Sequence, residues 1–175
     1  MHRKEERLEV IASDRWADLE KVGAPDPLDG RLERAGVVLA PMWGYMGRDR
    51  PLFPSDTREL FRHLRDTPGH GMRIEVADSG AKYQELSLNS QEWFLPLIMI
   101  AELAQAPYVV ALVSQYLYER LRSVLPGRNV AIESDVCVKS EHGEVTIRYR
   151  GPADAWERVM LETLASLPRG DSENQ

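Results

Sequence analysis

The 26-residue stretch Trp93–Tyr118, WFLPLIMIAELAQAPYVVALVSQYLY, carries a single formal charge, Glu102, in a chain that is 29% charged. So much apolar surface must be buried in protein or in lipid, because leaving it in water is costly. Where this stretch goes therefore decides the predicted fold.

Three features favour burial inside folded protein. Pro107 lies in the middle of the stretch and would interrupt a continuous helix. Glu102 and Gln105 lie beside it, where lipid would be costly for an acid. Neither half, 93–106 nor 107–118, reaches the roughly 20 residues that a spanning helix needs. We predict a buried helical hairpin over 93–118, with a subunit interface or membrane contact as the alternatives.

A β-hairpin is predicted after this stretch. Alternate positions are apolar from Val130 to Val138 and from Val145 to Tyr149, with Ser134 in the series and a turn at His142–Gly143. Arg148 and Arg150 would face Glu133 and Asp135 across the strands. Gly151–Pro152 ends the second strand, and an apolar stripe from Trp156 to Leu167 predicts a closing helix.

Before the stretch, the patterns predict further helices and strands. Helical spacing indicates a helix over 4–22, and the residues 36–40 indicate a short strand ended by Pro41. Ser55 is a candidate N-cap for a helix that ends near Asp66. Alternation over 72–76 and a second run over 82–88, joined by a turn at 78–80, predict another hairpin.

These elements predict an α+β fold in which an antiparallel sheet of about four strands packs against a helical hairpin and a C-terminal helix. Residues 1–66 hold 12 basic and 13 acidic residues and are interpreted as a charged helical N-terminal extension. Residues 67–168 hold most of the apolar residues and are predicted as the core domain, with a flexible tail over 169–175.

Composition limits the function classes. The net charge of −6 argues against a broad basic face, so we expect no nucleic-acid partner. Cys137 is the only cysteine, which excludes an intrachain disulfide and a cysteine-based zinc site. The charged start lacks a secretory signal pattern, and a cytoplasmic location is expected.

No complete catalytic, cofactor or metal motif is present, so we predict no catalytic residues, no cofactor and no metal site. Cys137 falls on a predicted strand and is interpreted as a structural residue. His70, in the loop Pro68-Gly69-His70-Gly71, is the one candidate acid–base group. It supports the alternative of a small hydrolase with dispersed acid–base residues.

The loop Pro41–Pro54, PMWGYMGRDRPLFP, combines aromatic, Met and Arg residues, which are enriched in the cores of protein interfaces. It either folds back over the sheet or binds a partner. Glu102 either touches water at a helix end or contacts an arginine of a neighbouring helix or partner protein. The predicted interface residues are Trp43, Tyr45, Met46, Arg48, Arg50, Trp93, Glu102 and Tyr116.

The order of these patterns resembles the effector-associated constant components, small proteins of bacterial conflict systems. The matching parts are the apolar region 93–118, the arginine-containing stop 119–122, the hairpin 130–150 and the segment 151–155. The resemblance covers about half of the chain, and Pro107 and the N-terminal extension depart from it. It implies a non-enzymatic partner or adaptor of an effector and carries over no catalytic residue.

The sequence therefore predicts a non-enzymatic protein–protein interaction or adaptor protein, an accessory of a bacterial defence or conflict system. A protein partner and self-association are both expected. The alternatives are the small hydrolase and a protein associated with membranes through residues 93–118.

Overall fold

The computed structural model describes residues 6–16, 30–42, 52–77, 85–86, 92–124 and 130–168. The strands are β1 (Arg7–Ser13), β2 (Val37–Ala40), β3 (Phe53–Pro54), β4 (Ile74–Val76), β5 (Glu85–Leu86), β6 (Glu92–Phe94), β7 (Leu97–Ile100), β8 (Ala131–Ser140) and β9 (Gly143–Pro152). The α-helices are α1 (Thr57–Asp66), α2 (Ala106–Val124) and α3 (Trp156–Ser166), and short 3-10 helices are η3 (Leu103–Gln105) and η4 (Ala153–Ala155).

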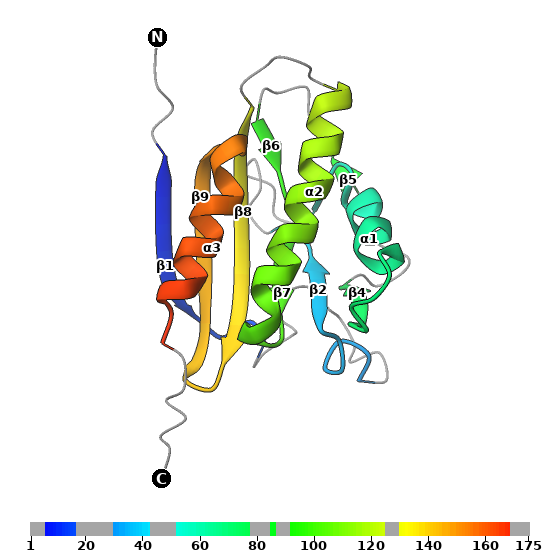
Figure 1. Cartoon of the computed structure of the whole chain (residues 1–175). Helices are drawn as coiled ribbons and strands as arrows, with labels where there is room; N and C mark the ends of the chain where they lie inside the picture. The colour runs from blue at the N-terminus through cyan, green and yellow to red at the C-terminus, as the bar shows by residue number, and fades with distance from the viewer. Residues whose placement is uncertain are drawn as a thin grey trace.

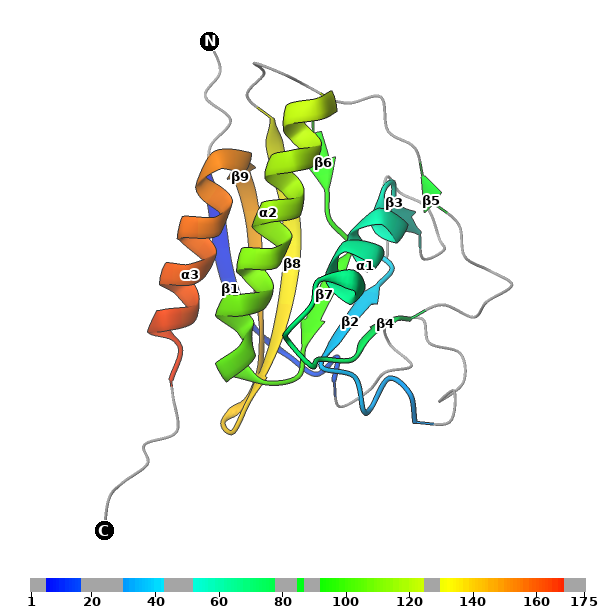
Figure 2. The same ribbon diagram turned by 45° about the vertical axis from the view of Figure 1, so that its right-hand side comes forward.

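Seven of the described strands form one mixed sheet in the order β1-β9-β8-β7-β2-β4, with β6 also paired to β8. The pairs β1–β9, β9–β8 and β7–β2 are antiparallel, whereas β8–β7 and β2–β4 are parallel. The parallel pairs follow from two crossovers, because α2 connects β7 to β8 and α1 connects β2 to β4. All three helices lie on the same face of the sheet (Figures 1 and 2).

The main core lies between the sheet and the helices. Alternate residues of the central strands, among them Leu39, Ile98 and Ile147, meet the buried faces of the three helices there. The opposite face of β2, β7 and β8 carries a smaller cluster that includes Val38, Met99 and Cys137. The central strands are therefore buried on both faces, whereas β1 is exposed along nearly its whole length.

The predicted hairpin after residue 130 is confirmed. β8 and β9 pair from Ala131 opposite Pro152 to Ser140 opposite Gly143. Arg148 Nε lies 3.0 Å from Asp135 Oδ1, as the predicted cross-strand charge pairing requires. The closing helix is confirmed as α3, and it buries Trp156, Met160 and other apolar residues against the sheet.

The predicted helical hairpin over 93–118 is wrong in its first half. Residues 92–94 and 97–100 are the strands β6 and β7, and both pair in parallel with β8. Phe94 lies opposite Glu133 and Ile98 opposite Val136, so one extra residue is accommodated at Leu95–Pro96 as a bulge. A run such as Leu97–Ile100 without alternation is typical of a strand buried on both faces.

Pro107 does not separate two helices. It is the second residue of α2, in the first turn, where proline is tolerated because the first amide groups of a helix have no intrahelical partner. Within the described residues, no helix has both the length and the apolar character needed to cross a bilayer.

The predicted helix over 4–22 is also wrong, because residues 7–13 form β1, which pairs with β9 along all seven residues. The spacing of Leu8 and Ile11 suits a helix, but Leu8 and Val10 also alternate as in a strand. Tertiary pairing with β9 selects the strand. The helical prediction for the extension 1–66 therefore fails at β1, and both β1 and β2 lie in the same sheet as the later strands.

The predicted hairpin over 72–88 is wrong as well. β4 pairs in parallel with β2, and β5 pairs in parallel with β3 in a separate two-stranded sheet. The short strand predicted at 36–40 is confirmed as β2. The helix ending at Asp66 is confirmed as α1, but its N-cap is Asp56 instead of Ser55.

The described part of the chain is thus a mixed α/β fold with one multistranded sheet and three α-helices. The prediction of a sheet packed against helices is confirmed. The sheet nevertheless has more strands than the four predicted, and it is mixed instead of antiparallel, because β2–β4, β6–β8 and β7–β8 are parallel pairs.

Candidate functional site

Two pockets lie at one end of the sheet. β7 and β8 end there, β2 and β4 begin there, and α2 starts beside them. The larger pocket has a volume of about 620 Å³ and is lined by Ala101, Glu102, Leu103, Ala104, Pro107, Lys139, Ser140, Glu141 and Pro168. The smaller has about 480 Å³ and is lined by Glu33, Arg34, Ala35, Gly36, Gly71, Met72, Arg73, Ala101, Glu102 and Gln105.

Glu102 lines both pockets and connects them. It follows β7 and has an extended backbone, and its carbonyl accepts the N–H of Gln105 at 3.1 Å to begin η3. Its side chain is exposed, as expected for an acid at a helix end that touches water. We call the residues that line the two pockets the sheet-end surface.

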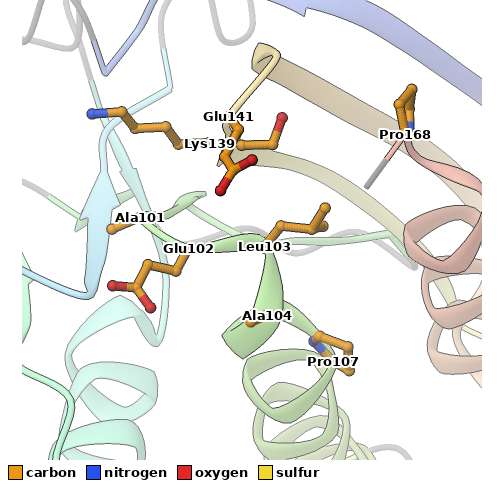
Figure 3. A pocket seen from close by; sticks show the side chains of 9 residues that line it. Ala101, Glu102, Leu103, Ala104, Pro107, Lys139, Glu141 and Pro168 are labelled. Atoms are coloured by element: carbon orange, nitrogen blue, oxygen red, sulfur yellow. The ribbon is translucent and has the colours of Figure 1, made fainter. Parts of the chain in front are cut away.

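The larger pocket combines an apolar wall with charged side chains. Leu103, Pro107 and Pro168 supply apolar surface, while Lys139 and Glu141 come from the end of β8 and its turn. Figure 3 shows these labelled side chains around the same opening as Glu102. Such a surface suits a ligand or peptide that has both an apolar and a charged group.

The other predicted interface residues fall in three places. Trp43, Tyr45, Met46, Arg48 and Arg50 lie outside the described residues. Trp93 is half-buried in β6 and packs against the main core. Tyr116 is buried in α2, and its hydroxyl lies 3.4 Å from the carbonyl of Asp56, so most of its surface is used within the fold.

His70 has structural partners at both ring nitrogens. Its Nδ1 accepts the N–H of Met72 at 3.0 Å, because an amide N–H can only donate. Nε2 therefore carries the proton and donates it to the carbonyl of Leu64 at 2.7 Å. The ring connects the last turn of α1 to the segment before β4, and neither nitrogen is left for acid–base chemistry in this arrangement.

Cys137 is fully buried on the face of the sheet away from the helices. Its Sγ donates to Glu144 Oε2 at 3.2 Å and lies 3.4 Å from Ser13 Oγ. Burial, together with the Glu144 carboxylate, raises the pKa of the thiol from 9.0 to about 12. A thiol held neutral in this way is a poor nucleophile, which agrees with the structural role predicted for it.

Nothing in the part of the chain that the structure describes gathers three or more His, Cys, Asp or Glu side chains in the arrangement of a metal site. Lys139, Glu141 and Pro168 were missed as site residues by the sequence reasoning. They lie more than 30 positions from Glu102 in the sequence. The pairing of β7 with β8 brings Lys139 and Glu141 near it, and the packing of α3 beside α2 brings Pro168 there.

The fold and surface define a class only broadly: a mixed α/β protein with all of its described helices on one side of the sheet and two adjoining pockets at the sheet end. Comparison with known proteins finds no match to a family model, a curated protein or a solved structure.

Proposed function

We propose that this chain is a non-enzymatic interaction or adaptor protein that acts in the cytoplasm and binds a protein partner at the sheet-end surface. One observation carries the proposal: Glu102, an interface residue predicted from sequence, is exposed where the two pockets meet. The pockets adjoin each other, so one extended segment of a partner can occupy both.

The lining indicates the chemistry of that partner. The larger pocket offers Leu103, Pro107 and Pro168 to an apolar side chain. The lining of the larger pocket includes two carboxylates, those of Glu102 and Glu141, and one ammonium group, that of Lys139, so the formal charge of this pocket is negative. A segment that carries an apolar residue next to a lysine or arginine fits both features.

The further proposal, that the partner is an effector of a bacterial conflict system, has its support in the resemblance of about residues 72–167 to accessory proteins of such systems. The hydrolase alternative lacks comparable support, because both ring nitrogens of His70 bind main-chain groups. We therefore propose no enzymatic activity.

Site-specific photo-crosslinking in the native cell tests the proposal. A photoreactive residue at Ala104, which is exposed and lines the larger pocket, should cross-link to a partner that mass spectrometry identifies. The matched control places the same group at Ala165, an exposed position on α3. Crosslinks from position 104 that are absent from position 165 support binding at the sheet-end surface.

The identified partner is then purified and its affinity measured by calorimetry. Glu102→Arg should weaken binding about tenfold or more, because it replaces an attraction for a cation with a repulsion. Glu119→Arg, the same charge change at an exposed position near the other end of α2, should leave the affinity unchanged. Equal affinities for the wild type and Glu102→Arg would overturn the proposal.

A further inference from the structure

β1 forms one edge of the sheet. Its pairing within the described residues is with β9 alone, along its whole length of seven residues. In Figure 1 it lies at the outer side of the sheet, beside β9 and next to α3. The described part of the structure therefore leaves the other side of β1 open.

The main-chain groups that face this open side can be assigned. Leu95 donates its N–H to the carbonyl of Glu133, so the main-chain groups of Glu133 face β6 and those of Ser134 face β9. Ser134 lies opposite Tyr149, which in turn lies opposite Leu8. Because these groups alternate between the two sides of a strand, Leu8 and every second residue from it direct their N–H and C=O away from β9.

β1 also exposes apolar side chains on both faces of the sheet. Leu8 and Val10, on the helix face, are 44% and 47% exposed, and Ile11, on the other face, is 39% exposed. A helix or loop packed on one face of the sheet would cover either Leu8 and Val10 or Ile11, but not both groups. A strand added in the plane of the sheet would contact both, as well as the open main-chain groups.

We propose that this strand is β1 of a second copy of the chain, paired antiparallel about a two-fold axis through Leu8. In this register Leu8 meets its own counterpart on the helix face, and Arg7 lies directly opposite Glu9 of the other copy. Each even-numbered pair from 6 to 10 can exchange main-chain hydrogen bonds across the axis. The two sheets become one continuous sheet.

Charge complementarity favours this self-pairing. On the face away from the helices, Arg7 lies directly opposite Arg150 of β9, so its cross-strand neighbour in the sheet is another cation, which in turn lies opposite Glu133 of β8. Glu9 lies opposite Arg148, with the charged atoms 4.0 Å apart. In the dimer, Glu9 of the second copy approaches Arg7 from its open side and gives it a neighbour of opposite charge.

A register shifted by one residue is disfavoured, because it would place like charges directly opposite each other. Moving the axis by one residue, to Glu9, would place the two Glu9 side chains directly opposite each other. The register through Leu8 instead forms two Arg7–Glu9 pairs, one on each side of the axis. This inference concerns a different surface from the sheet-end surface, so neither proposal depends on the other.

Analytical ultracentrifugation of the full chain over a range of concentrations tests the dimer. The wild type should sediment as a dimer that dissociates on dilution. Arg7→Glu and Glu9→Arg should each raise the dimer dissociation constant about tenfold or more, because each turns two attractive pairs into repulsive ones. The double variant R7E/E9R restores opposite charges at both positions and should recover most of the affinity.

Arg62→Glu, the same change at an exposed position of α1, should dimerise like the wild type, and circular dichroism should show that all variants are folded. As an independent measurement, the amides of Leu8 and Val10 should be protected from hydrogen exchange in the dimer and lose this protection on dilution. A wild type that is monomeric at every concentration, no effect of Arg7→Glu, or no recovery in the double variant would each overturn the proposal.

Discussion

Trp156 donates its indole N–H to the hydroxyl of Ser134 across a distance of 2.9 Å, and both residues are buried. Ser134 interrupts the apolar face of β8 at the point where α3 packs on it. A buried indole N–H needs a hydrogen-bond partner, so the serine in this apolar series has a structural reason.

Ser134→Ala is therefore expected to destabilise the protein by about 1–3 kcal/mol, because it leaves the Trp156 N–H buried without its partner. Calorimetry should show a melting temperature lower by about 2–4 °C for each kcal/mol in a protein of this size. Ser123→Ala, at an exposed serine of α2, provides the control and should change stability by less than about 0.5 kcal/mol. Equal melting temperatures for both variants would contradict the prediction.

Pro107→Ala tests the position of proline in α2. Because Pro107 is in the first helical turn, the substitution should change the free energy of unfolding by less than about 1 kcal/mol. Ala111→Pro, at an exposed site one turn further on, should cost about 3 kcal/mol or more because it removes an intrahelical hydrogen bond. Chemical denaturation followed by circular dichroism measures both, and a large effect of Pro107→Ala would contradict the assigned start of α2.

Arg120→Met tests how α2 holds the start of α1. The guanidinium binds both carboxylate oxygens of Asp56 at 3.0 and 3.1 Å, and this hydrogen bonding raises the pKa of Arg120. Because the pair is partly solvated, we expect a loss of about 0.5–1.5 kcal/mol in denaturant unfolding. Arg158→Met, which breaks an exposed pair with Glu162 on α3, should lower the free energy of unfolding by less. A larger loss for Arg158→Met than for Arg120→Met would contradict the role of Arg120 in joining α2 to α1.

The tautomer of His70 can be measured directly. The bonds to Met72 and Leu64 require the proton on Nε2, and nitrogen-15 NMR of the ring should report this form in the neutral state. His70→Ala removes both bonds and should destabilise the protein by about 1–3 kcal/mol. His142→Ala, in the exposed hairpin turn, should be nearly neutral. Observation of the Nδ1–H tautomer would contradict the assigned bonds.

The buried thiol of Cys137 should make the stability of the protein depend on pH in the alkaline range. Its thiol pKa is 9.0 before folding and about 12 in the folded protein, so folding favours the neutral thiol. The resulting stability is fully present below pH 9 and is lost as the pH rises from 9 toward 12. Urea unfolding of the wild type should show this loss relative to Cys137→Ala, and identical pH profiles would contradict it.

In the folded protein at pH 8, the thiol should react slowly with aromatic disulfides and rapidly after unfolding.

The sequence was sufficient where structure depends on neighbouring residues. The hairpin of β8 and β9 and the helices α1 and α3 follow from alternation, helical spacing and turn residues within one segment. Glu102 could be selected as a site residue because it is the single charge in an apolar stretch. Its exposure at the sheet end follows from its place just after β7.

Only the tertiary structure decided the remaining elements, because their local patterns fit two conformations equally well. Leu97–Ile100 is a strand because β2 and β8 pair with it on both sides, and Arg7–Ser13 is a strand because β9 offers it hydrogen bonds. β4 pairs with β2, which precedes it by more than 30 residues, and not with the segment after it. The local pattern of a segment does not show which distant segment it will pair with. The sheet order and the grouping of Lys139, Glu141 and Pro168 around Glu102 are therefore visible only in the tertiary structure.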